Sequence, residues 1–161
     1  VSTGGDRLIV SGADGSAIVD TDGSVIGTYP LRRPFPGDRA TAGSTCVVLS
    51  DGSGPEGGGQ VSIVALEDGS IVNEVDATAP LWATADGCTL VSPVDDGYQV
   101  ASPEAVSFVV TDDRLGGLSP DGANVVLTVG SRLSLADATT GPGDDDVDLG
   151  PAGRRIGFTQ L

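Results

Sequence analysis

Seven Asp-Gly dipeptides constrain the fold of this chain more than any other feature. They begin at Asp14, Asp22, Asp51, Asp68, Asp86, Asp96 and Asp121. Short runs rich in valine, isoleucine and leucine lie between them, such as Val61–Leu66 and Val125–Val129. Asp-Gly tolerates the positive φ angles of a tight hairpin turn, and the flanking runs have the composition of strands. Because 25 glycines and 10 prolines interrupt the longer helical windows, the sequence predicts an all-β meander.

The order of predicted strands and turns repeats four times. The segment that begins at Arg114 reads strand, SPDG turn, strand, turn and strand, and the segment from Pro80 has the same order with a TADG turn. The turn glycines of the four units lie 38, 44 and 35 residues apart, at Gly5, Gly43, Gly87 and Gly122. A four-stranded propeller blade takes about 40 residues. The sequence therefore predicts a single small β-propeller with blades at residues 1–37, 38–78, 79–112 and 113–153.

The two ends of the chain suggest how such a ring closes. The first unit begins at its turn and lacks the strand that precedes the turn in later units, whereas Arg155–Leu161 has a strand pattern with no turn after it. We expect residues 154–161 to form a closing strand in the first blade, which would hide two sheet edges. The alternative is that the chain is a fragment of a larger propeller.

The last unit carries a recognisable repeat motif. The stretch LSPDGANVVLTVGSRLSLADATTG resembles the repeat of TolB-type or WD40-like bacterial β-propellers. The elements of that motif are Ser119, Pro120, Asp121 and Gly122, followed by Asp137, Thr140 and Gly141. The match is weaker over residues 79–111 and loose over the first 78, and the chain has no Trp-Asp dipeptide. The resemblance implies blade architecture and does not specify an activity.

Charge and missing residue types exclude several functions. All eight basic residues are arginines, and 23 acidic residues bring the net charge to −15. That charge disfavours nucleic acids and anionic membrane surfaces as partners. With no histidine and no lysine, a Ser-His-Asp triad, a Cys-His pair and a Schiff base are all excluded. No apolar run is long enough for membrane insertion. We expect a non-catalytic protein without a cofactor.

The two cysteines, Cys46 and Cys88, occupy nearly equivalent positions in adjacent units. This placement predicts a disulfide and an oxidising, extracytoplasmic compartment. Closing a loop of that length stabilises a fold by roughly 3–4 kcal/mol in the chain-entropy model. Two buried free thiols in a cytosolic protein are the alternative.

The segment Tyr29–Arg39, YPLRRPFPGDR, differs most from the rest of the chain. It combines three prolines, two aromatic residues and three arginines in a chain that is otherwise acidic and poor in aromatic residues. Arginine and aromatic side chains are enriched at interface hot spots, and proline lowers the ordering cost of binding. We therefore predict a protein-binding site formed by Tyr29, Arg32, Arg33 and Phe35. An irregular loop that packs Phe35 into its own domain is the alternative.

The densest acidic cluster is GDDDVDLG, which contains Asp144, Asp145, Asp146 and Asp148. A divalent cation would relieve the repulsion among these carboxylates, and their hard oxygen ligands suit Ca²⁺. A solvated surface loop is the simpler interpretation.

Together these features favour a non-catalytic, extracytoplasmic binding or scaffold module, such as an accessory subunit of a larger cell-envelope or membrane complex. The alternative function is a divalent-cation-dependent enzyme or a lectin-like ligand-binding domain that uses the aspartate-rich loops.

Overall fold

The computed structural model describes residues 2–4, 7–34, 44–53, 59–78 and 80–152. These residues form four antiparallel sheets, each built from four strands that are consecutive in the chain. Among them, no helix has the length and hydropathy needed to cross a bilayer.

The strand boundaries are as follows. The first sheet contains β1 (Ser2–Gly4), β2 (Arg7–Gly12), β3 (Gly15–Asp20) and β4 (Val25–Pro30). The second contains β5 (Arg33–Pro34), β6 (Cys46–Ser50), β7 (Gly59–Ala65) and β8 (Ile71–Ala77). The third contains β9 (Trp82–Ala83), β10 (Leu90–Val94), β11 (Gly97–Ala101) and β12 (Val106–Val110). The fourth contains β13 (Arg114–Leu118), β14 (Asn124–Val129), β15 (Arg132–Asp137) and β16 (Val147–Pro151).

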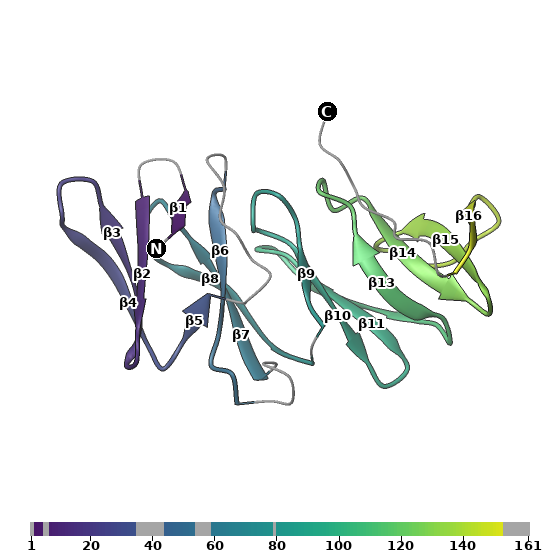
Figure 1. Ribbon diagram of the computed structural model, residues 1–161, viewed down its shortest axis with the longest axis horizontal. Helices are drawn as coiled ribbons and strands as arrows, with labels where there is room; N and C mark the ends of the chain where they lie inside the picture. The colour runs from purple at the N-terminus through teal and green to yellow at the C-terminus, as the bar shows by residue number, and fades with distance from the viewer. Residues whose placement is uncertain (1, 5–6, 35–43, 54–58, 79, 153–161) are drawn as a thin grey trace.

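The four sheets follow one another across the molecule in chain order, with the first and fourth at opposite ends (Figure 1). The principal contacts between sheets, such as β2 with β5 and β10 with β13, join sheets that are neighbours in sequence. The predicted all-β fold of four blade-like sheets is therefore confirmed. The predicted closing strand, residues 154–161, lies outside the described residues.

Three details of the predicted organisation are wrong. The first unit does have a strand before its turn, because β1 pairs with β2. The second blade begins before residue 38, because β5 pairs with β6 of the second sheet through Arg33 and Pro34. Proline is tolerated there because β5 is an edge strand. The acidic segment is not simply a loop, since Val147–Pro151 forms the outer strand of the fourth sheet.

The hydrophobic core is divided among the three junctions between sheets. Ile9 and Ile18 of the first sheet pack against Val47 and Leu49 of the second. The next cluster joins the second and third sheets around Ile63 and Leu90, and the last joins the third and fourth. Each sheet thus depends on its neighbours for burial of its apolar faces, as expected for a stack of repeated units.

The predicted repeat is visible in the hydrogen bonds of its turns. The Thr84 hydroxyl of the TADG turn donates to Asp86 at 2.5 Å, and the Ser119 hydroxyl of the SPDG turn donates to Asp121 at 2.6 Å. Both hydroxyls also accept a hydrogen bond from the backbone N–H five residues later, at 3.0 and 2.9 Å. The hydrogen bond from Ser119 is the main reason that the pKa of Asp121 lies below its ordinary value. One local network, set by hydroxyl and carboxylate spacing, shapes equivalent turns in two blades.

Candidate functional site

The segment that connects the first and second sheets, residues 29–33, contains most of the predicted contact residues, and we call it the Leu31 turn. Tyr29, at the end of β4, is buried in the core between these sheets. Its hydroxyl donates to the backbone carbonyl of Gly69 at 2.5 Å. Burial, followed by the charge of Asp68, raises the pKa of the hydroxyl above its ordinary value. Tyr29 therefore anchors this turn to the second sheet.

Arg32 anchors the other side of the Leu31 turn. Its side chain is only 16% exposed, and its guanidinium forms an ion pair with Glu74 at 2.5 Å and donates to Gln60 at 2.8 Å. It also donates to the hydroxyl of Ser62, which in turn donates to Glu74 at 2.9 Å. These groups lie on β7 and β8. Arg32 is thus held on the surface of the second sheet.

Between the two anchors, Leu31 adopts a left-handed backbone conformation with φ = 62°. Its side chain is 71% exposed. The backbone N–H of Leu31 donates to the carbonyl of Asp14 at 2.9 Å, which ties the turn to the β2–β3 hairpin. A non-glycine residue pays about 1–2 kcal/mol for this conformation. The surrounding anchors therefore hold an exposed leucine in a strained position.

Arg33 follows Leu31 by two positions in the chain and is also exposed. It donates one hydrogen bond to the carbonyl of Ala13 at 3.2 Å. The Leu31 turn thus presents one apolar and one cationic side chain on a supported backbone.

The predicted contact site is therefore revised. Tyr29 and Arg32 are anchors whose interacting groups are already satisfied within the chain, and they do not form an exposed contact surface. Arg33 remains a contact candidate, and Phe35 lies outside the described residues. Leu31 was missed, because a leucine between Pro30 and two arginines carries no local signal for a left-handed conformation.

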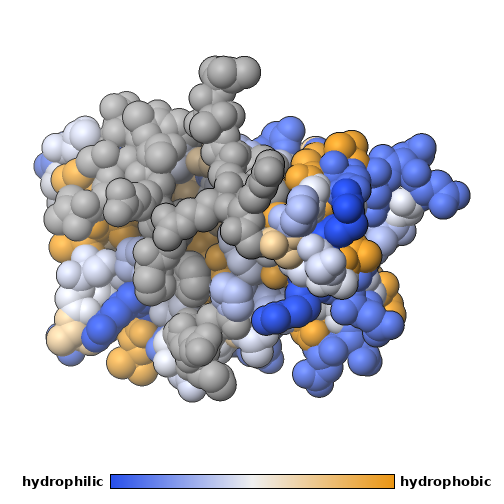
Figure 2. Space-filling view, turned by 45° about the vertical axis from the view of Figure 1, so that its right-hand side comes forward, coloured by the Kyte–Doolittle hydropathy of each residue, from blue (hydrophilic) through white to orange (hydrophobic). Residues whose placement is uncertain are grey.

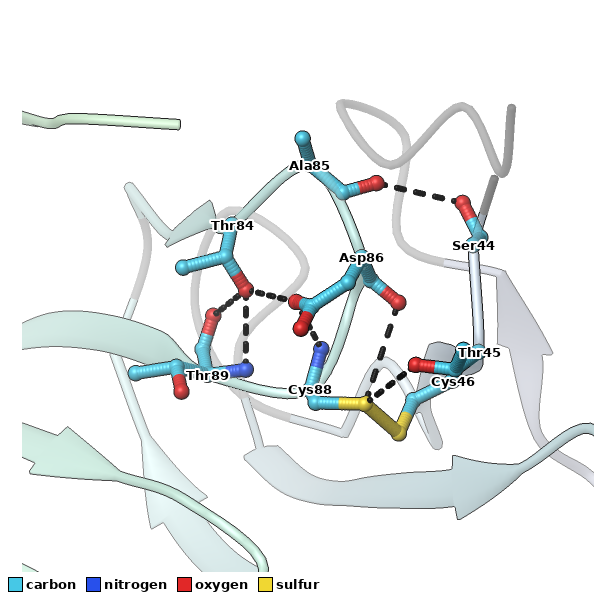
Figure 3. The surroundings of a disulfide bond; sticks show 8 residues. All are labelled: Ser44, Thr45, Cys46, Thr84, Ala85, Asp86, Cys88 and Thr89. Carbon is cyan, nitrogen blue, oxygen red and sulfur yellow. Dashed lines mark hydrogen bonds between the residues drawn. A yellow bond between two sulfur atoms is a disulfide. The ribbon is translucent and has the colours of Figure 1, made fainter. Parts of the chain in front are cut away.

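The predicted disulfide between Cys46 and Cys88 is present, with Cα atoms 5.0 Å apart (Figure 3). It joins the start of β6 to the turn before β10, and so links the second and third sheets. Backbone N–H groups of Thr45 and Cys46 donate to the carbonyl of Asp86 at 3.0 and 2.9 Å. A Cβ atom at Gly87, where φ is +75°, would lie 2.4 Å from the carbonyl oxygen of Cys46. The close approach of this turn to β6 therefore requires glycine.

The predicted calcium cluster does not assemble. Asp148 forms an ion pair with Arg132, which lowers the pKa of Asp148 below its ordinary value. Asp146 accepts hydrogen bonds from the Gly143 N–H at 3.1 Å and from the Ser134 hydroxyl at 3.4 Å. Asp144 and Asp145 are exposed. Within the described ranges, no three carboxylate or cysteine side chains are grouped to hold a metal ion, so the calcium prediction is not supported.

Two other acidic pairs do come together. Asp95 and Asp96 on the β10–β11 hairpin, and Asp112 and Asp113 between β12 and β13, line a hollow of about 320 Å³ beside Arg114. They come together within the third sheet, because β11 pairs with β12 and sets Gly97 opposite Val110, and the Thr111 N–H donates to the Asp96 carbonyl at 3.1 Å. The hollow is acidic, but among the described residues its carboxylates are not grouped to hold a metal ion.

No protein-family model and no curated protein matches the sequence. Several solved structures are similar to the fold of this chain. The dihydro-heme d1 dehydrogenase NirN, in complex with DHE, superposes with a TM-score of 0.53 at 15% identity over 94% of this chain and 36% of that chain. A eukaryotic initiation factor superposes with a TM-score of 0.53 at 14% identity, over 91% of this chain and 41% of that chain. Kluyveromyces lactis Hsv2 superposes with a TM-score of 0.45 at 16% identity, over 84% of this chain and 46% of that chain.

The chain thus spans about two fifths of the length of the first two of these structures. At such low identity the likeness shows the fold alone. The four sheets have the arrangement of β-propeller blades, in agreement with the predicted repeat.

Proposed function

We propose that this chain is a non-catalytic binding or scaffold module of an extracytoplasmic protein, an accessory subunit of a larger cell-envelope complex, with repeats of the TolB-type or WD40-like class. The observation that carries the proposal is the Leu31 turn. An exposed leucine occupies a strained backbone conformation between two anchored residues. Strain of this kind persists only where the surrounding structure enforces it, and it is concentrated at functional positions.

The Leu31 turn is suited to protein recognition. Tyr29 and Arg32 hold the backbone before any partner arrives, so binding incurs little ordering cost. Leu31 offers an apolar contact, and Arg33 offers a planar cation that pairs with carboxylates or stacks on aromatic rings. A partner with an apolar pocket next to an acidic or aromatic group fits this pair of side chains.

The proposed compartment is supported by the Cys46–Cys88 disulfide. Structural disulfides persist in oxidising compartments and are rare in the cytosol.

The test is a mild-detergent purification of the native protein from envelope membranes, read by quantitative mass spectrometry. We compare the natural chain with the double variant Leu31→Asp/Arg33→Glu. The matched control is Val110→Asp, which changes a valine that is 82% exposed on β12, in the third sheet. The expected result is a stoichiometric partner that is lost from the double variant and retained by the control.

Recovery of the natural chain alone would refute the accessory-subunit proposal. A partner that is lost with Val110→Asp and kept by the double variant would move the contact site away from the Leu31 turn.

A further inference from the structure

The three junctions between sheets use the same positions of each repeat. In the second strand of a sheet, one set of alternate residues packs against the preceding sheet. These residues are Val47 and Leu49, Leu90, and Val125 and Leu127, and each is at most 1% exposed. Ser92, the next alternate residue after Leu90, is also fully buried and accepts a hydrogen bond from Gln99, which donates to Asp76 of the second sheet as well. The residues between these alternate positions pack against the following sheet, as Ile9, Val48 and Val91 do. Every sheet therefore has a preceding face and a following face.

The preceding face of the first sheet has the same construction, but the described chain supplies no sheet to cover it. Leu8 and Val10 of β2 flank Ile9, and the strand register pairs them with Val19 and Ala17 of β3. Val10 is 45% exposed, whereas the equivalent residues Leu49, Ser92 and Leu127 are fully buried. A hollow of about 300 Å³, lined in part by Val10 and Ala17, opens on this face.

The following face of the fourth sheet lies at the opposite end of the molecule. The register places Val126, Leu135 and Val147 side by side across β14, β15 and β16. The equivalent pair in the third sheet, Val91 and Val100, is buried against the fourth sheet. Val147 is 55% exposed and Leu135 is half-buried, whereas Val126 is already buried, so the open part of this face lies on β15 and β16. Figure 2 turns this end toward the viewer and shows hydrophobic residues (orange) among hydrophilic ones.

We propose that these two end faces are the two halves of one interface, formed between two copies of this chain. The following face of the fourth sheet in one copy packs on the preceding face of the first sheet in the other, which continues the packing already present at the three internal junctions. Such an interface is head-to-tail, and two copies that each contribute both faces can close a ring.

The repeated junctions between sheets favour a second copy as the occupant of both end faces. At every internal junction a following face packs on a preceding face. No junction in the described part of the fold packs two preceding faces or two following faces together. This inference does not depend on the partner proposed for the Leu31 turn.

The first experiment measures the native molar mass of the full chain over a concentration series. The expected mass is twice 16.0 kDa. Val10→Asp and Val147→Asp each place a charge in the interface, and Val110→Asp is the matched control on β12. An unpaired buried charge costs several kcal/mol, so either interface variant should raise the dimer dissociation constant by about 100-fold or more. Near-ultraviolet circular dichroism and an intact disulfide establish that each variant is folded.

A mixing experiment tests the head-to-tail geometry. In a ring of Val10→Asp chains, or of Val147→Asp chains, both interfaces carry the charge. A one-to-one mixture of the two variants forms one interface that contains neither substitution, so the mixture should regain dimers that neither variant forms alone. A natural chain that is monomeric at every concentration would overturn the proposal. So would folded interface variants that dimerise like the control, or a mixture that regains no dimer.

Discussion

At the residue scale, Asp137 shows how a single carboxylate stabilises the end of a strand. Its Oδ1 accepts hydrogen bonds from the N–H and hydroxyl groups of Thr139 and Thr140, at 2.8 to 3.1 Å. These bonds, led by the Thr140 N–H, lower the pKa of Asp137 to about 2. Because the folded-state pKa lies below the ordinary value of 3.8, the stabilisation is complete above that value and is lost as the pH falls toward 2.

We therefore expect Asp137→Asn to lower the melting temperature at pH 6, and the difference from the natural chain to shrink as the pH approaches 2. Thermal unfolding across that range is the measurement. Asp144→Asn, in the exposed loop, is the control for the general effect of removing one negative charge. A difference that does not change with pH would contradict the assigned role of the Asp137 carboxylate.

A second prediction at this scale concerns the two buried tyrosines. Tyr29 donates to Gly69 across a sheet junction at 2.5 Å, whereas Tyr98 donates to the Asp137 carbonyl at the longer distance of 3.4 Å. A hydrogen bond of ordinary geometry contributes about 1 kcal/mol net, and a long one contributes less. Urea unfolding should therefore show a loss of about 1 kcal/mol for Tyr29→Phe and a smaller loss for Tyr98→Phe. Equal effects would argue against an anchoring role for Tyr29.

At the scale of elements, the disulfide cross-links the second and third sheets, whose described contacts are side-chain packing and hydrogen bonds from turns and side chains. Cys46 and Cys88 are separated by 42 residues. Cross-linking a loop of that length lowers the entropy of the unfolded chain, which raises the free energy of that state by about 4 kcal/mol at 25 °C. The double variant Cys46→Ala/Cys88→Ala should lose about that much unfolding free energy. Guanidinium denaturation provides the measurement.

Chemical reduction of the Cys46–Cys88 disulfide is the matched control for the double variant. The natural chain in excess dithiothreitol should unfold at nearly the same denaturant concentration as the double variant, and the double variant should not respond to dithiothreitol. If the oxidised natural chain and the double variant unfold together, the disulfide does not stabilise the junction between the second and third sheets.

At the scale of the whole molecule, the net charge of −15 opposes compaction. Only three ion pairs, Arg7 with Asp20, Arg32 with Glu74 and Arg132 with Asp148, join described residues. Repulsion among the remaining acidic groups should therefore dominate the response to salt. Raising NaCl from ~0.01 M to ~1 M shortens the screening length from about 30 Å to about 3 Å.

The melting temperature should consequently rise over this range of salt. The measurement is made at low protein concentration so that assembly does not contribute, and Val10→Asp serves as a control that does not assemble. A melting temperature that falls with salt would mean that the ion pairs outweigh the general repulsion.

The sequence by itself determined the repeating part of this structure. Asp-Gly turns and short β-branched runs act locally, so the run Val125–Val129 noted in the sequence lies within the observed strand β14, Asn124–Val129. The two cysteines were paired correctly because the repeat placed them at neighbouring turns. Strands that lack this local signal were missed: β5 consists of only Arg33 and Pro34, and its pairing depends on β6.

Only the tertiary structure decided how the candidate site is built. Tyr29 and Arg32 are anchors because the second sheet supplies Gly69, Ser62 and Glu74, residues at least 30 positions away in the chain. Likewise, Asp148 pairs with Arg132 on the adjacent strand, and the described acidic side chains are not grouped to hold a metal ion. Local sequence specifies turns and strands through short-range hydrogen bonds and side-chain alternation. Which side chains remain exposed depends on the packing of one sheet on the next.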